Sequence, residues 1–122
     1  MKAFIAALAV LALLVAGVIL SSAAGTSMLA EYLEALPSET ESPKAAADAL
    51  GELRDQVEER DRLLLCSLYH HEKVDTLASA IRRAEAAAKA DDETEYRILR
   101  SELESLLEDM KRDLHLHLGD IV

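Results

Sequence analysis

An uncharged apolar segment of eighteen residues, from Ala3 to Leu20, constrains this chain more than any other feature. As an α-helix with a rise of about 1.5 Å per residue, the segment would be about 27 Å long, close to the hydrocarbon thickness of a bilayer. A buried core helix is excluded, because no other part of the chain is apolar enough to surround it. We therefore expect residues 3–20 to cross a lipid bilayer as a single helix.

Two fates are open to this apolar segment. Small residues at 22–24 fit a signal peptidase site, and cleavage after Ala24 would give a secreted protein. The run is longer than the roughly 7–15 residues usual in a signal peptide, which favours a retained signal-anchor over residues 1–25. Lys2 is the only base before the segment and Lys44 is the first after it. The positive-inside rule then predicts a single-pass protein of the cell membrane with its C-terminal domain outside the cytoplasm.

The remainder of the chain is acidic and rich in helix-forming residues. Lys2 is the only charged residue before Glu31, so residues 28–122 hold 12 of the 13 Lys and Arg and all 23 Asp and Glu, a net charge of −11. Such a surface repels nucleic acid, which we exclude as a partner. Gly 4, Pro 2 and an aromatic content of 3% argue against a β-sandwich or barrel. The composition predicts an all-α fold.

A short helix and a linker are expected directly after the apolar segment, over residues 26–43. Met28 to Leu36 has apolar residues at helical spacing, and it either begins at a Ser27 N-cap or prolongs the membrane helix. The next seven residues are polar and bracketed by prolines, which indicates a linker. Ser42 as N-cap and Pro43 at the first helical position then predict a new helix.

Residues 44–90 contain no proline and one glycine, Gly51. Their apolar residues follow one helical stripe, which consists of Leu50, Leu53, Val57, Leu64, Leu68, His71, Val74, Ala78 and Ile81. The favoured interpretation is one continuous or kinked helix of about 45 residues. The alternative is a break between Cys66 and His71, where three consecutive leucines blur the stripe. Glu58 with Arg62, and Glu85 with Lys89, are expected as ion pairs on the outer face.

A last helix follows the turn at Asp91 and Asp92. Asp92 and Glu95 form a capping box, and Gly119 is expected to end the helix. Its apolar stripe consists of Tyr96, Leu99, Leu103, Leu106, Leu107, Met110 and Leu114. The short turn predicts an antiparallel hairpin in which contacting residues sum to about 182, so Met110 lies near Glu72. Residues 44–122 are thus expected to form a helical hairpin or small bundle.

A hairpin alone buries too little apolar surface to be stable. Its apolar face is expected to be covered by residues 28–36 and the first half of the long helix, or by a second copy of the chain.

One known family shares the layout of this sequence. The stretch His71-Glu72-Lys73-Val74-Asp75, the acidic turn, the amphipathic helix and the final Gly-Asp-Ile-Val resemble small membrane-anchored bacterial proteins classed as domain of unknown function 4363. The resemblance extends from the apolar segment to Val122. Leu65 stands where that family has tryptophan, and the acidic balance replaces a lysine-rich one. The resemblance implies a helical extracytoplasmic domain behind one membrane segment, without a known activity.

The histidines and the single cysteine are the candidates for chemistry. His71 and Asp75 are one helical turn apart, and the favoured interpretation is a structural pair. The alternative hypothesis is a metal site in which Cys66, His115 and His117 join His71 and Asp75, since imidazole and thiolate suit zinc or copper(I). His115 and His117 point about 200° apart on a helix, which argues against it. Cys66 is otherwise expected to be a buried small hydrophobe, or to form a disulfide across a dimer.

No enzyme is predicted. The sequence has no Gly-rich phosphate loop, nucleophile elbow or CxxC pair, so we assign no catalytic residue and no cofactor. We expect a protein–protein interaction or structural module, with an integral membrane protein or a second copy as partner. The alternative is an extracytoplasmic metal-binding protein.

Overall fold

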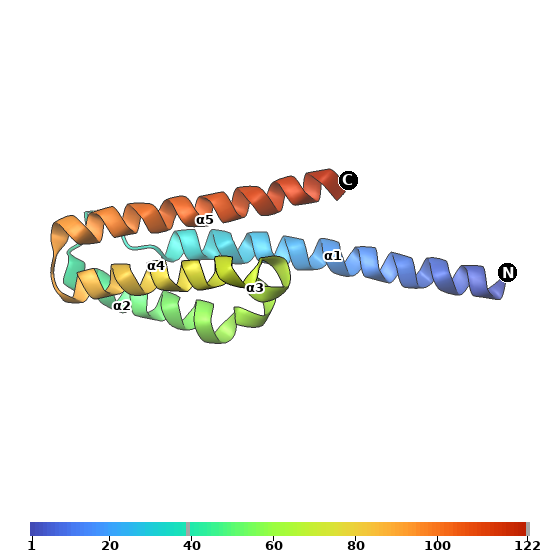
Figure 1. Cartoon of the computed structure of the whole chain (residues 1–122), viewed down its shortest axis with the longest axis horizontal. Coiled ribbons are helices and arrows are strands. Elements are labelled where there is room, and N and C mark those ends of the chain that lie inside the picture. The colour runs from blue at the N-terminus through green and yellow to red at the C-terminus, as the bar shows by residue number, and fades with distance from the viewer. Residues whose placement is uncertain (39, 122) are drawn as a thin grey trace.

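The computed structural model describes the backbone of residues 1–38 and 40–121, and the side chains of residues 1–20, 23–38 and 40–114. This part of the chain is all-helical, without strands, as predicted. The elements are α1 (Lys2–Ala35), α2 (Pro43–Asp55), the π-helical η1 (Gln56–Arg60), α3 (Arg62–Leu68), α4 (His71–Lys89) and α5 (Glu93–Ile121). In Figure 1, α1 projects far beyond the other helices at its N-terminal end.

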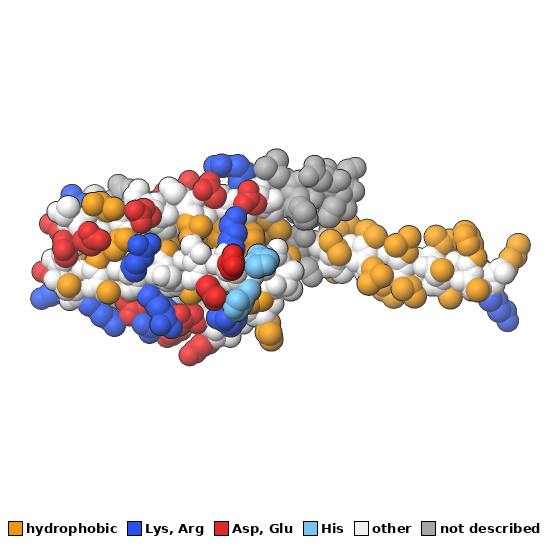
Figure 2. All heavy atoms as spheres, viewed as in Figure 1, with side chains coloured by type: hydrophobic (Ala, Val, Ile, Leu, Met, Phe, Trp, Pro, Cys, Tyr) orange, Lys and Arg blue, Asp and Glu red, His pale blue; other side chains and the backbone are white. Residues whose placement is uncertain are grey.

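Helix α1 has two halves with opposite environments. The large apolar side chains from Phe4 to Leu20 are exposed, and they cover the projecting arm in Figure 2. Further along the same helix, Leu29 and Tyr32 are fully buried in the hydrophobic core. Residues 28–35 therefore prolong the apolar helix, and Ser27 caps no helix. Among the described residues, α1 is the one helix long and apolar enough to cross a membrane.

The favoured single helix over residues 44–90 is wrong, and the chain breaks twice. It begins as predicted, with Ala45 N donating to Ser42 Oγ (3.4 Å) and Pro43 in the first turn. The chain then widens into the π-helical turn η1 and bends at Asp61. A second break follows α3, where Tyr69 and His70 have extended backbones. This second break lies in the region of the alternative prediction, between Cys66 and His71.

The two breaks change which side chains of the predicted stripe enter the core. Leu65 is fully buried instead of Leu64, which is half-buried together with Leu68. His71 is exposed rather than part of the stripe, because α4 starts anew at this residue. The stripe members on α2, η1 and α4 proper are buried as expected, namely Leu50, Leu53, Val57, Val74, Ala78 and Ile81.

Helices α4 and α5 are joined by a tight turn at Asp91, which has a φ of 56°. Asp91 N donates to Ala88 O and Asp92 N to Ala87 O (both 3.1 Å), the pattern of a Schellman motif. Glu95 N donates to Asp92 Oδ1 (3.2 Å), so the predicted N-cap of α5 is present. Gly119 does not end this helix, which continues to Ile121.

Helix α5 runs back along α4 close to the expected register. The contacting pairs are Tyr69 with Met110, Arg83 with Glu102, and Lys73 with Asp113, whose residue numbers add up to 179, 185 and 186. Helix α2 packs against α4, and α1 packs against α5. The apolar faces of α4 and α5 are therefore covered by other helices of the same chain. We call the packed part, residues 25–114, the helical domain.

Candidate functional site

The predicted His71–Asp75 pair lies at the start of α4. His71 Nε2 is 3.2 Å from Asp75 Oδ2, and Arg62 approaches the other carboxylate oxygen at 3.6 Å. Both partners are exposed, with 64% and 52% of their side-chain surface accessible. His70 has a different task, because its Nδ1 accepts the backbone N–H of Glu72 (3.4 Å) and so caps α4. His71 thus forms an exposed pair with Asp75, and His70 caps the N-terminus of α4.

The other residues of the metal hypothesis do not join this pair. Cys66 is exposed on α3, so its prediction as a buried hydrophobe is wrong. The side chains of His115 and His117 lie outside the described residues. In the part of the chain that the structure describes, no three His, Cys, Asp or Glu side chains converge in a way that could hold a metal ion. The metal site stays a prediction.

A buried carboxylate between α2 and α4 was missed by sequence reasoning. Glu85 was expected on the outer face, yet its side chain is only 4% exposed. Arg54 donates two hydrogen bonds to it (2.5 and 2.8 Å), and Lys89 lies 2.8 Å away. Gly51 faces Glu85 across the interface, and a Cβ at this position would meet the carboxylate at ordinary contact distances of 3.8 and 3.9 Å. The Glu85 carboxylate on α4 thus links this helix to α2 through Arg54, and it is also paired with Lys89.

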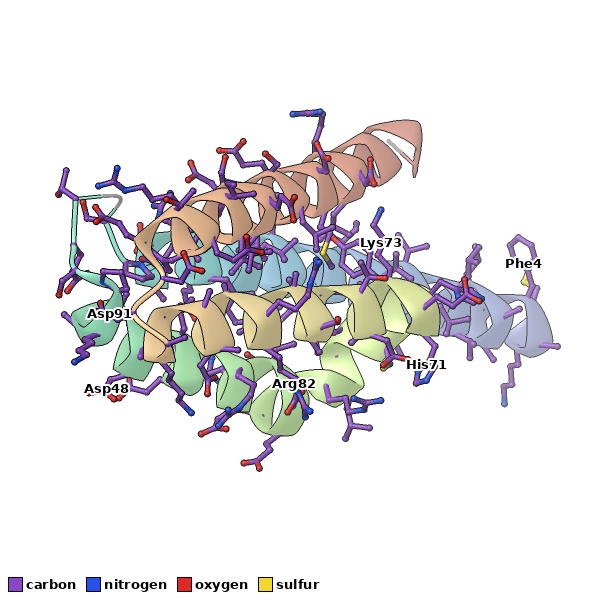
Figure 3. All side chains as sticks on the ribbon, turned by 60° about the vertical axis from the view of Figure 1, so that its left-hand side comes forward. Phe4, Asp48, His71, Lys73, Arg82 and Asp91 are labelled. Atoms are coloured by element: carbon purple, nitrogen blue, oxygen red, sulfur yellow. The ribbon has the colours of Figure 1, made fainter. Side chains whose placement is uncertain are left out.

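A second bridge between α2–η1 and α4 is exposed. Arg82 donates two hydrogen bonds to Glu58 (2.6 and 2.8 Å), and Glu58 does not form the predicted pair with Arg62. These bonds from Arg82 lower the pKa of the Glu58 carboxyl. Arg82 lies midway along the domain in Figure 3. The bridge connects η1 to α4.

The bend at Asp61 is attached to α1. Tyr32 OH donates to Asp61 Oδ2 (2.5 Å), and Arg60 donates to both carboxylate oxygens (3.1 and 3.0 Å). Burial, followed by the bond to Asp61, raises the pKa of Tyr32. Partial burial opposes ionisation of Asp61, but hydrogen bonds from Arg60 and Tyr32 outweigh it and lower its pKa. The bend is thus held by a contact to the helix that carries the apolar arm.

A further polar contact ties the linker to α5. The guanidinium of Arg100 is buried, its Nε donates to the backbone oxygen of Pro37 (2.6 Å), and an NH group donates to Glu104 (2.5 Å). This contact positions the linker at the end of the domain opposite the apolar arm (Figure 1).

A shallow hollow lies between α3 and α5, lined by Leu68, Tyr69, Asp113 and Leu114. Its volume of about 140 Å³ is well below the roughly 300–1,000 Å³ of small-molecule sites. Tyr69 is anchored there by donating to Met110 O (2.6 Å), and burial raises its pKa to about 12.

No protein-family model, curated protein or solved structure matches this chain. The geometry therefore has to carry the functional interpretation by itself. What it offers is a charged helical surface on a domain joined directly to an apolar helix.

Proposed function

We propose that this chain is a membrane-anchored helical protein whose domain forms a small bundle outside the cytoplasm and acts as a protein–protein interaction or structural module. The observation that carries the proposal is the continuity of α1, which is exposed and apolar up to Leu20 and fully buried at Leu29 and Tyr32. A helix shared in this way holds the domain directly on the bilayer, without a flexible tether.

Retention of the anchor is supported by the position of the small residues that resemble a cleavage site. Cleavage after Ala24 would sever α1 within its hydrogen-bonded helical backbone, next to the buried Gly25. The single base Lys2 on the N-terminal side supports an outward-facing domain.

The surface of the domain is charged rather than apolar. It therefore suits protein–protein contacts that are mainly electrostatic. Among the described side chains of the helical domain, the large hydrophobics that are exposed are Leu63 and Ile98. The domain instead holds 22 Asp and Glu against 12 Lys and Arg, a net charge of −10. A partner would be an integral membrane protein with a basic surface, or a second copy brought close by the shared membrane. Membership of the domain of unknown function 4363 family is part of this proposal, since the helical layout agrees with it.

The proposal is tested in membranes of cells that express the full chain with a C-terminal tag. The anchored protein is expected to resist carbonate extraction, and protease added outside the cytoplasmic membrane is expected to remove the tag. A carbodiimide cross-linker, which joins carboxylates to nearby lysines, should then give one discrete adduct. An extractable protein would refute the anchoring, and a chain that remains uncross-linked at expression from its own promoter would refute the interaction role. An adduct of twice the mass would identify a second copy as the partner.

A further inference from the structure

One stretch of the acidic domain has no acidic residue. The ten residues 62–71, between Asp61 and Glu72, include no Asp or Glu. No other stretch after Glu31 is as long without an acidic residue. Arg62 supplies one positive charge, and the stretch also contains four leucines and a tyrosine. It comprises α3, the extended break and the first residue of α4. We call it the acid-free segment.

The acid-free segment lies at the end of the domain from which the apolar arm emerges. A Cβ built on Gly25 of α1 would be 2.4 Å from Leu68 Cδ1, so α3 touches α1 at that residue. Gly25 is five residues beyond Leu20, or about 7.5 Å along the helix axis. In Figures 1 and 3, α3 and His71 lie toward the arm, whereas Asp48 and Asp91 lie at the far end. If residues 3–20 span the hydrocarbon, the segment lies in the headgroup layer, about 5–8 Å thick.

The exposed side chains of the segment suit that layer. Leu63 is 89% exposed, the highest value among the large hydrophobics of the helical domain that the structure describes. Leu64 and Tyr69 are half-buried, and tyrosine is enriched at membrane interfaces, although the Tyr69 hydroxyl itself donates to Met110 O within the domain. Of the nearby carboxylates, Asp61 is paired with Arg60 and Asp75 with His71, whereas the side chain of Glu72, directly after the segment, is exposed. This end of the domain can therefore approach headgroup phosphates, which the rest of the acidic surface would repel.

We propose that the acid-free segment is a second membrane contact, which rests in the headgroup layer of the bilayer that α1 crosses and inserts Leu63 at its surface. This inference rests on the proposed anchoring. It adds that this end of the domain faces the membrane, so that a partner can reach only its sides and its far end.

The single cysteine allows a direct test with the full chain in phosphatidylcholine vesicles. An environment-sensitive fluorophore is attached to Cys66, which is exposed on α3. The matched control carries Cys66→Ser and Ala86→Cys, which moves the label to an exposed position near the far end of α4. Lipids brominated near the headgroup end of their acyl chains are expected to quench the label at residue 66 and to leave the label at residue 86 unquenched.

A pair of surface variants tests the role of Leu63. In the chain labelled at Cys66, Leu63→Glu is expected to abolish the quenching, whereas Ile98→Glu, at the other exposed hydrophobic of the domain, should leave it unchanged. Both changes affect exposed side chains, so the domain remains folded. Quenching that survives Leu63→Glu would overturn the insertion of this residue.

Flotation of the vesicles separates this inference from the proposed function. A chain that floats with the vesicles while both labels stay unquenched would overturn the second contact and leave the anchor in place. A chain that does not float would overturn both.

Discussion

Replacing Leu29 by alanine tests whether the continuation of the membrane helix is a core element. Leu29 is fully buried, and α1 is held there against α5 and α3, which leaves little freedom to close a cavity. Loss of a buried leucine side chain with partial relaxation costs about 2–5 kcal/mol. At about 3 kcal/mol, the folded-to-unfolded ratio falls more than a hundredfold, a large share of the roughly 5–14 kcal/mol expected for a domain of this size.

The assay is urea unfolding of the full chain in micelles, followed by near-ultraviolet circular dichroism. The signal comes from Tyr32, Tyr69 and Tyr96, because the chain has no tryptophan and these three tyrosines lie in the helical domain. With a slope of about 1–3 kcal/mol/M, the midpoint of Leu29→Ala should fall by about 1–3 M urea. The control is Leu14→Ala in the apolar arm, a residue that is 63% exposed and should leave the midpoint unchanged. Equal midpoints for the two variants would refute the buried role of residues 28–35.

Other predictions concern charge, turn geometry, pH and metal. Glu85→Gln should cost about 1–3 kcal/mol, because it leaves Arg54 without its anion in a site where Arg54 is still 32% exposed; Glu102→Gln, at an exposed 3.8 Å pair, should cost less than about 0.5 kcal/mol. Asp91→Gly should stabilise the domain by up to about 1 kcal/mol, since Asp91 has a φ of 56° that glycine adopts without strain. Because folding raises the pKa of Tyr69 to about 12, its contribution to stability is complete below about pH 10 and is lost as pH rises towards 12, and Tyr69→Phe should flatten that decline. If His71 and Asp75 form a structural surface pair, zinc should leave the melting temperature unchanged.

Each of these outcomes has a clear opposite. Glu85→Gln as mild as Glu102→Gln would show that the buried carboxylate does not link α2 to α4. A destabilised Asp91→Gly would mean that the aspartate side chain itself holds the turn. A stability decline above pH 10 that is identical in Tyr69→Phe would assign it to the other tyrosines. A melting temperature raised by zinc would favour the metal-binding alternative.

Two local signals in the sequence predicted helix starts correctly. These signals are Ser42 with Pro43, and Asp92 with Glu95. Each involves residues only a few positions apart in the sequence, and a helix begins at each of them in the structure. The antiparallel register of α4 and α5 also followed from a short turn, because a turn of fixed length leaves little choice of pairing.

Within residues 44–90, the break at Asp61 had no local signal, and the one after α3 was indicated only by the three leucines that gave the alternative prediction. Neither Asp61 nor Tyr69 is accompanied by glycine or proline, so turn chemistry gives no warning there. The bend at Asp61 depends on a hydrogen bond from Tyr32, and the one after α3 on the bond from Tyr69 to α5. The burial of Glu85 likewise depends on Arg54 from another helix. Contacts between residues that are distant in sequence decided all three features, and a helical periodicity cannot reveal such contacts.

Hydrogen exchange at residues 21–27 of the full chain in lipid nanodiscs tests most directly whether one helix serves as both membrane anchor and core element. A continuous α1 from Lys2 to Ala35 predicts that these amides are protected to a similar degree as those of the buried turn around Leu29. Exchange of residues 21–27 at the rate of an unstructured peptide would show a flexible tether, and would contradict the account.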